Sequence, residues 1–115
     1  IPTFADYRDF LAASRGEWSI AKHGYVAART GWFSCRTACY LACGRPAVVQ
    51  DTGWSRHLPA GSGLLGFTTL DECVAALDRV DADYRAQREA ARAFAEKHLD
   101  AARVCARLLA DAGLG

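Results

Sequence analysis

Three cysteines spaced four residues apart, Cys35, Cys39 and Cys43, form the first pattern in the sequence that could do chemistry. Residues four apart lie on one side of an α-helix, so a helix would align these thiols in one stripe. A structural zinc site requires a fourth ligand and usually contains a Cys-x-x-Cys pair, and neither is apparent in the sequence. Cysteine is also a small and often buried residue, so we favour close helix packing over a metal or redox role. If one thiol is reactive, it is Cys35, because the dipole at the start of a helix lowers the pKa of a thiol.

The same segment predicts an anion site at its start. Ser34 is a favoured N-cap residue, and Gly44 and Pro46 are suited to ending the helix. A helix that begins at Ser34 presents unpaired backbone N–H groups and the positive end of its dipole, which suits a diphosphate. Arg36 could add a charged hydrogen bond to phosphate. The alternative is that Ser34 only caps the helix and that Arg36 is a surface charge.

More polar residues follow two predicted strands. Lys22 and His23 come after the run "EWSIA", and Asp51, Thr52 and Gly53 come after "PAVVQ". In open α/β sheets, ligands bind at the carboxyl ends of the strands, and a glycine there permits close approach. A simple turn after the strand is the alternative, since Asp and Gly favour turns as well. His23 is more typical of a surface loop than of a catalytic site.

Strands that alternate with helices indicate a parallel sheet with helices on its faces. About three strands are visible, which is few for a doubly wound domain, so we expect further strands upstream of this chain or from a partner. Thr69 and Glu72 form a capping box before one helix. The expected helices cover residues 4–14, 34–43, 69–80 and 82–112, the last with a break near 98–100; the strands cover 17–22, 46–51 and 64–67; loops cover 23–31, with a possible extended stretch at 25–26, and 52–63.

The composition is that of one globular domain. The chain has 115 residues and a formal net charge of +1, which predicts no general affinity for nucleic acid. No apolar run approaches the ~20 residues of a membrane span, and the first residues lack the features of a signal peptide. The five cysteines are an odd number and fit reduced thiols in a cytoplasmic protein better than a disulfide framework.

Three blocks of the sequence resemble one enzyme class. "SRGEWSIAKHGYV", "RTGWFSCRTACYLACGRPAVVQDTG" and "LPAGSGLLGFTTLDECVAAL" occur in the order found in the C-terminal, donor-binding half of GT-B glycosyltransferases, and most resemble bacterial family-1-like members. The resemblance runs from about Tyr7 to Leu109. It implies that a nucleoside diphosphate sugar binds at the carboxyl ends of the strands, that the acceptor binds a separate N-terminal domain, and that no metal or other cofactor is needed.

The resemblance also assigns roles to single residues. Glu17 resembles the first acidic residue of the S-x-x-E segment of the family, whose carboxylate could accept hydrogen bonds from sugar or ribose hydroxyls. Cys39 stands where many relatives carry a second glutamate, and this departure puts the usual ribose contact in doubt. The residues predicted to bind the donor are Glu17, Lys22, Ser34, Arg36, Asp51, Thr52 and Gly53, and no catalytic residue is assigned.

The predicted fold is therefore α/β: a partial Rossmann-like domain, the GT-B C-terminal half, with a small parallel sheet and a long C-terminal helical region. We expect residues 1–115 to be one donor-binding fragment, inactive alone, that lacks the acceptor domain. An exposed sheet edge would favour homo-oligomers. The alternative function is a non-catalytic α/β binding or interaction module derived from such a domain.

Overall fold

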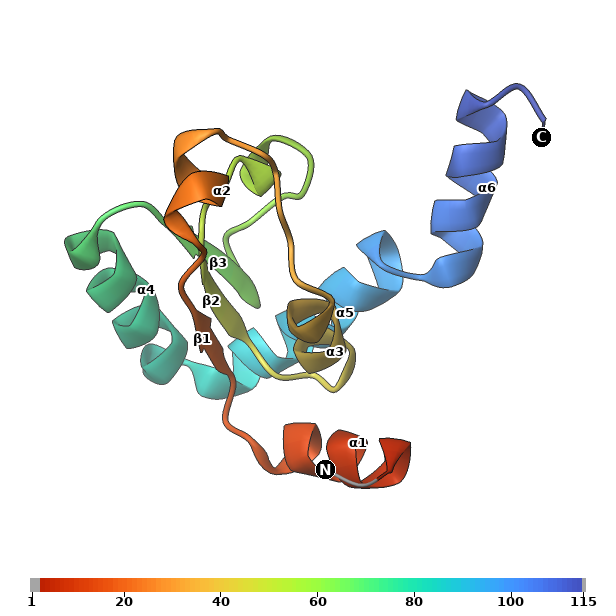
Figure 1. Cartoon of the computed structure of the whole chain (residues 1–115). Coiled ribbons are helices and arrows are strands. Elements are labelled where there is room, and N and C mark those ends of the chain that lie inside the picture. Colours follow the sequence, from red (N-terminus) through yellow and green to blue (C-terminus); the bar gives the residue numbers. More distant parts are fainter. Residues whose placement is uncertain (1–2, 115) are drawn as a thin grey trace.

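A computed structural model describes residues 3–114 and shows three strands between layers of helices (Figure 1). The helices alternate with the strands along the chain, as the sequence predicts. The elements are α1 (Phe4–Ala13), β1 (Glu17–Ser19), α2 (His23–Ala27), α3 (Cys35–Ala42), β2 (Ala47–Gln50), the short 3-10 helix η1 (Trp54–Arg56), β3 (Leu64–Phe67), α4 (Leu70–Ala82), α5 (Tyr84–His98) and α6 (Ala101–Asp111).

The three strands form one parallel sheet in the order β1-β2-β3. Glu17 pairs with Ala47 at the start of β1, and Val48 pairs with Leu65 between β2 and β3. Because β2 is central, its Ala47, Val48 and Val49 are all buried, as expected for a parallel sheet covered on both faces. The structure thus confirms the predicted α/β class with a small parallel sheet.

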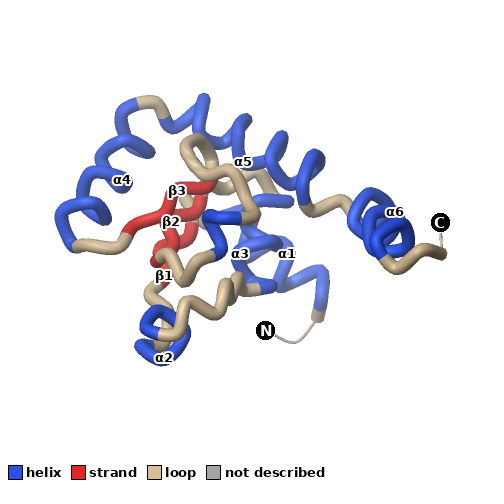
Figure 2. Tube along the Cα trace, turned by 90° about the horizontal axis from the view of Figure 1, so that it is seen from above, coloured by secondary structure: helices blue, strands red, loops and turns tan. Residues whose placement is uncertain are grey.

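Helices cover both faces of this sheet (Figure 2). On one face, α3 and α5 enclose a core with Leu41, Val49 and Phe94 among its members. On the other face, α4 packs against Val48 and Leu65. The predicted signals at the helix ends are present: Ser34 caps α3, Thr69 and Glu72 form a capping box at the start of α4, and Gly44 takes a left-handed conformation with φ of 69° just after α3.

Two local expectations are corrected by the structure. Residues 23–31 were expected to form a loop with an extended stretch at 25–26, but His23–Ala27 is the helix α2. Gly24 hides this helix from the sequence pattern because glycine disfavours helices, and α2 has no side-chain cap. The first strand ends at Ser19 and not at Lys22, because the N–H of Ala21 donates to the side-chain oxygen of Gln50, at 3.0 Å, instead of continuing the ladder.

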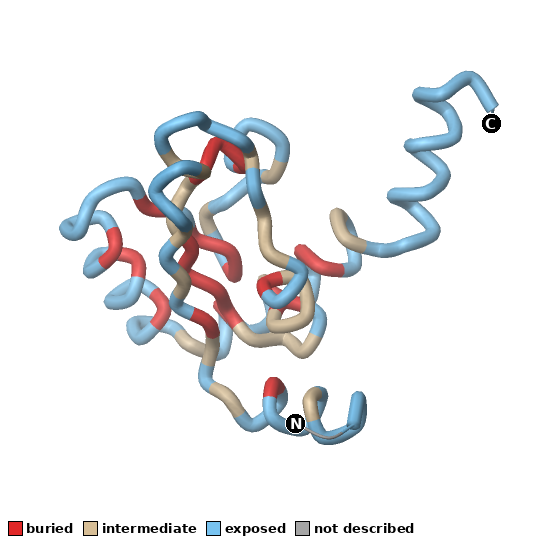
Figure 3. Tube along the Cα trace, viewed as in Figure 1, coloured by how far each residue is buried: buried red, intermediate tan, exposed pale blue. Residues whose placement is uncertain are grey.

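The long C-terminal helical pattern breaks at Leu99–Asp100, inside the predicted range. The first part, α5, buries Ala91, Phe94 and Ala95 against the sheet. The second part, α6, has no buried residue and projects away from the rest of the molecule (Figures 1 and 3). Within residues 3–114, no helix has the length and apolar character needed to cross a membrane.

Candidate binding cleft

A hollow of about 250 Å³ lies where β1 and β2 end, at the edge of the sheet where open α/β folds bind ligands. Four of the seven residues predicted to bind a donor line it together. These are Lys22, Ser34, Arg36 and Thr52. The remaining lining residues are Ser19, Ile20, Ala21, Tyr25, Trp32, Val49 and Gln50.

The first turn of α3 borders this cleft. The Ser34 hydroxyl oxygen accepts a hydrogen bond from the N–H of Arg36 at 3.2 Å, and the Ser34 carbonyl accepts one from Ala38. The N–H groups of Cys35 and Thr37 have no hydrogen-bond partner in the described part of the chain. The helix start therefore keeps backbone donors and the positive end of its dipole, a combination that favours anions.

A buried carboxylate, that of Glu17, holds the Arg36 side chain in place. Glu17 begins β1, and its side chain is only 4% exposed. One carboxylate oxygen accepts a hydrogen bond from Nε of Arg36 at 2.5 Å, and the other accepts one from the hydroxyl of Thr37, which is fully buried. Arg36 also donates to the Ser19 hydroxyl at 3.1 Å. The hydrogen bond to Glu17 and the charge of that group hold the pKa of Arg36 above its ordinary value.

Glu17 is therefore placed beneath the cleft and is not part of its lining. Both of its oxygens accept hydrogen bonds from the protein. Arg36, by contrast, keeps 54% of its side chain exposed. The geometry makes Glu17 a group that fixes the Arg36 guanidinium, while the Arg36 side chain stays exposed at the cleft.

Two aromatic residues that the sequence analysis did not single out form a wall of the cleft. The rings of Tyr25 and Trp32 stack with centroids 5.3 Å apart and planes inclined at 30°. Lys22 lies with Nζ 6.0 Å from the Tyr25 ring centroid. Trp32 is half exposed, so this stacked pair offers an apolar surface to a planar ligand group. The sequence feature that could have revealed this wall is the presence of two aromatic residues, Tyr25 and Trp32, in the segment that follows the first predicted strand.

Thr52 shapes the cleft from inside the protein. Its side chain is buried, and its hydroxyl donates to the backbone oxygen of Trp32 at 2.6 Å. The N–H of Gly31 in turn donates to the Thr52 carbonyl at 2.9 Å. These two bonds tie the segment that leads into α3 to the end of β2. Thr52 therefore positions Trp32 and the start of α3.

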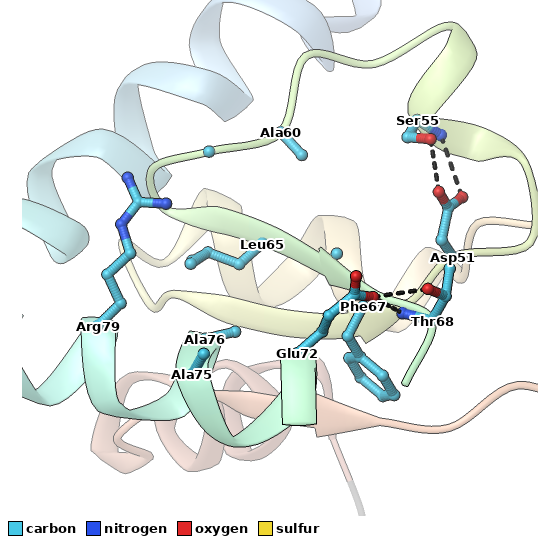
Figure 4. Close-up of a pocket in the computed structure, with 12 residues that line it drawn as sticks. Asp51, Ser55, Ala60, Leu65, Phe67, Thr68, Glu72, Ala75, Ala76 and Arg79 are labelled. Carbon is cyan, nitrogen blue, oxygen red and sulfur yellow. Dashed lines mark hydrogen bonds between the residues drawn. The ribbon is translucent and has the colours of Figure 1, made fainter. Parts of the chain in front are cut away.

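Asp51 faces a different hollow, of about 500 Å³, between β3 and α4 (Figure 4). Its carboxylate accepts hydrogen bonds from the Gly53 N–H at 2.8 Å and the Ser55 hydroxyl at 2.6 Å. Partial burial by itself would raise the pKa of Asp51, but the hydrogen bonds from Ser55 and Gly53 and the charge of Arg29 outweigh it and lower the pKa. Asp51 thus organises the turn after β2 instead of lining the cleft with Arg36.

Gly53 lines neither of these two hollows. It has φ of 104°, in the left-handed region, and a Cβ there would lie 2.9 Å from a guanidinium nitrogen of Arg56 and 3.3 Å from the Arg29 carbonyl. The glycine is required by the backbone and by these two neighbours. Close approach of a sugar to Gly53 stays a prediction.

The cysteine stripe does not gather metal ligands. All five cysteines are free thiols, and the described residues contain no group of three or more His, Cys, Asp or Glu side chains that could hold a metal ion. Cys39 is half buried, and burial raises the pKa of its thiol, with smaller effects from Cys43 and Cys35. None of the three thiols of the stripe is buried, since Cys35 is exposed and Cys43 is half buried like Cys39, and the buried residues of α3 are Thr37 and Leu41. The packing role of these cysteines therefore stays a prediction.

The fold is a partial Rossmann-like α/β domain, and its cleft lies at the carboxyl edge of the sheet. A family model described as glycosyl transferase-like matches residues 2–110 of this chain. Because the match covers most of the sequence, the protein belongs to the glycosyl transferase-like family. No curated protein and no solved structure matches the chain.

Proposed function

We propose that this domain binds the nucleoside diphosphate of a sugar donor in the cleft at the ends of β1 and β2. The main support is one arrangement: Ser34 and Arg36, at the start of α3, line the same hollow, next to the helix end whose Cys35 and Thr37 N–H groups have no partner among residues 3–114. Both features favour a diphosphate, and neither needs a metal. The proposal assigns donor binding, and not complete glycosyl transfer, to this chain.

The other predicted donor-binding residues differ in how directly they would act on the donor. Lys22 approaches the donor from the segment after β1, beside the Tyr25–Trp32 wall, which receives the base or the sugar ring. Thr52 and Glu17 act indirectly, through Trp32 and Arg36. Asp51 and Gly53 hold the turn at the end of β2, next to the cleft.

In glycosyl transfer, negative charge grows on the diphosphate as its bond to the sugar breaks. A guanidinium and helix N–H groups that are already in place stabilise this charge without reorganising. Glu17 accepts a hydrogen bond from Nε of Arg36, and the Ser19 hydroxyl accepts one from Nη2. We propose that the remaining N–H groups of the Arg36 guanidinium, those on Nη1 above all, meet the departing phosphate.

Isothermal titration calorimetry of the chain with UDP, GDP, ADP and TDP tests this function. We expect one of these to bind, and Arg36→Ala to weaken it about tenfold, the effect of losing a charged hydrogen bond. Arg107→Ala, on the exposed face of α6, is the matched control and should bind normally. Failure of all four nucleotides to bind, or equal affinity in Arg36→Ala, would contradict the proposal and favour a non-catalytic interaction module.

A further inference from the structure

A second concave surface lies at the opposite, amino end of the sheet. It is a hollow of about 310 Å³ between the turn after α3 and the first half of α5. Three arginines and one glutamate line it, so the lining carries a net formal charge of +2. The lining residues are Cys43, Gly44, Arg85, Arg88, Glu89 and Arg92.

The three arginines are engaged to different degrees. Arg92 is fixed, since its Nε donates to Glu96 at 2.8 Å and its Nη1 donates to the carbonyl of Ala42 at 2.5 Å. Arg85 makes a looser, largely exposed pair with Glu89 at 3.5 Å. Arg88 has no ion pair with any residue between 3 and 114; its guanidinium lies 5.8 Å from the centroid of the Tyr84 ring.

The turn after α3 leaves this hollow open, because its Gly44 has no side chain. Gly44 turns left-handed at the end of α3 with φ of 69°, and a Cβ there would be in ordinary van der Waals contact with the Arg88 carbonyl, at 3.7 Å, and with Cβ of Arg92, at 3.8 Å. The turn and α5 therefore approach closely, and no side chain at Gly44 fills the space beside them. The bond from Arg92 to Ala42 also offsets the negative end of the α3 dipole, which would otherwise repel an anion.

We propose that this hollow binds the phosphoryl group of an anionic ligand, at a site separate from the cleft at the other end of the sheet. Arginine guanidinium groups match phosphate oxygens in forked hydrogen bonds, and Arg88 is free to turn toward such a group. Arg85 and Arg92 supply positive charge on either side of it along α5. The phosphoryl group belongs either to a soluble phosphate or to a phospholipid headgroup, which share this chemistry.

Titration of inorganic pyrophosphate into ¹⁵N-labelled protein, followed by NMR, tests the proposal. We expect saturable shifts of the amides of Ala42, Cys43 and Gly44. In Arg88→Ala these shifts should need about tenfold more pyrophosphate, as for the loss of a charged hydrogen bond. Alanine favours helices and Arg88 is exposed, so this variant should fold. Arg103→Ala, which removes an exposed arginine from α6, is the matched control and should behave like the parent protein.

The same NMR titration distinguishes this hollow from the cleft at the other end of the sheet. Pyrophosphate in the cleft would shift Cys35 and Thr37, and Arg36→Ala would weaken those shifts while leaving Gly44 unaffected. Co-sedimentation with phosphatidylglycerol vesicles, against phosphatidylcholine vesicles, distinguishes a headgroup from a soluble phosphate as the source. Selective sedimentation that Arg88→Ala abolishes, or shifts at Gly44 from pyrophosphate alone, supports the proposal. The absence of both effects, or an unchanged response in Arg88→Ala, overturns it.

Discussion

At the scale of single residues, the cleft depends on a buried carboxylate. Glu17 and Arg36 lie 19 residues apart in the sequence, and their pairing brings the start of β1 to the first turn of α3. A buried carboxylate is costly unless its oxygens are satisfied, and here Arg36 and Thr37 satisfy both. Within residues 3–114, no buried side-chain nitrogen or oxygen lacks a partner.

Glu17→Ala should destabilise the protein because it removes two hydrogen bonds to a charged group and leaves the buried Thr37 hydroxyl without its acceptor. We expect a loss of roughly 2–3 kcal/mol in the free energy of unfolding, measured by urea denaturation. Glu89→Ala is the matched control. Its pair with Arg85 is exposed, so its removal should cost below about 1 kcal/mol. Equal losses in the two variants would show that Glu17 has no special structural role.

The turn after β2 should respond to acid through Asp51. Its pKa is lowered in the folded protein, so its contribution to stability is complete above the unfolded value of about 3.9 and is lost as the pH falls through the lower folded value. We expect the free energy of unfolding of the parent protein to drop below about pH 4, and to drop less steeply in Asp51→Asn. Identical acid profiles of the two proteins would contradict this assignment.

At the scale of elements, the helix starts could be read from the sequence because capping is local. Ser34 and the Thr69–Glu72 box mark α3 and α4 within one turn of chain. The helix α2 could not be found this way, because a short uncapped helix with an internal glycine has no local signal. The Tyr25–Trp32 stack likewise depends on the path of α2, which brings the two rings together.

Contacts between residues that are far apart in the chain could not be predicted from the sequence either. The strand-to-loop residues Asp51, Thr52 and Gly53 were predicted as one group because they are consecutive. The structure separates them: Thr52 lines the cleft, Asp51 faces the hollow beside α4, and Gly53 packs on Arg29 and Arg56. Neighbours after a strand end point in different directions, so their spacing alone does not define a site.

The contact between β3 and α5 requires a glycine at its start. Gly63 has φ of 77°, and a Cβ there would lie 2.3 Å from the backbone nitrogen of Ala91. Gly63→Ala should therefore cost roughly 2–5 kcal/mol of unfolding free energy, from the left-handed backbone and the clash together. Gly31→Ala isolates the backbone contribution, because Gly31 has φ of 78° with no atom within 4 Å, and should cost only about 1–2 kcal/mol. Similar costs for both would mean that α5 moves aside freely.

At the scale of the whole molecule, the chain leaves apolar surface uncovered. The radius of gyration is 14.8 Å, above the ~13 Å expected for a compact domain of this length, since α6 stands away from the core. On α6, Val104, Leu108 and Leu109 are exposed. At the outer edge of the sheet, Trp18 of β1 is 57% exposed, although its indole N–H reaches the Cys73 sulfur at 3.0 Å.

Because the outer edge of β1 is unpaired among residues 3–114, we expect copies of this chain to associate with one another. An unpaired strand edge offers backbone donors and acceptors to another strand, and an apolar neighbour such as Trp18 adds surface to bury. Static light scattering should show a mass that rises with protein concentration. Trp18→Lys should shift the chain toward monomers, since charge on an edge strand opposes pairing, with circular dichroism confirming that the variant is folded.

Leu108→Lys is the matched substitution on the other uncovered surface. If the sheet edge drives association, this change in α6 leaves the mass profile of the parent protein intact. If α6 drives it, the outcomes of the two variants are reversed, and the edge hypothesis is wrong. A parent chain that stays monomeric at every concentration contradicts both. The sheet edge is favoured beforehand because it joins unpaired backbone groups to apolar area, whereas the backbone of α6 is already hydrogen-bonded within the helix.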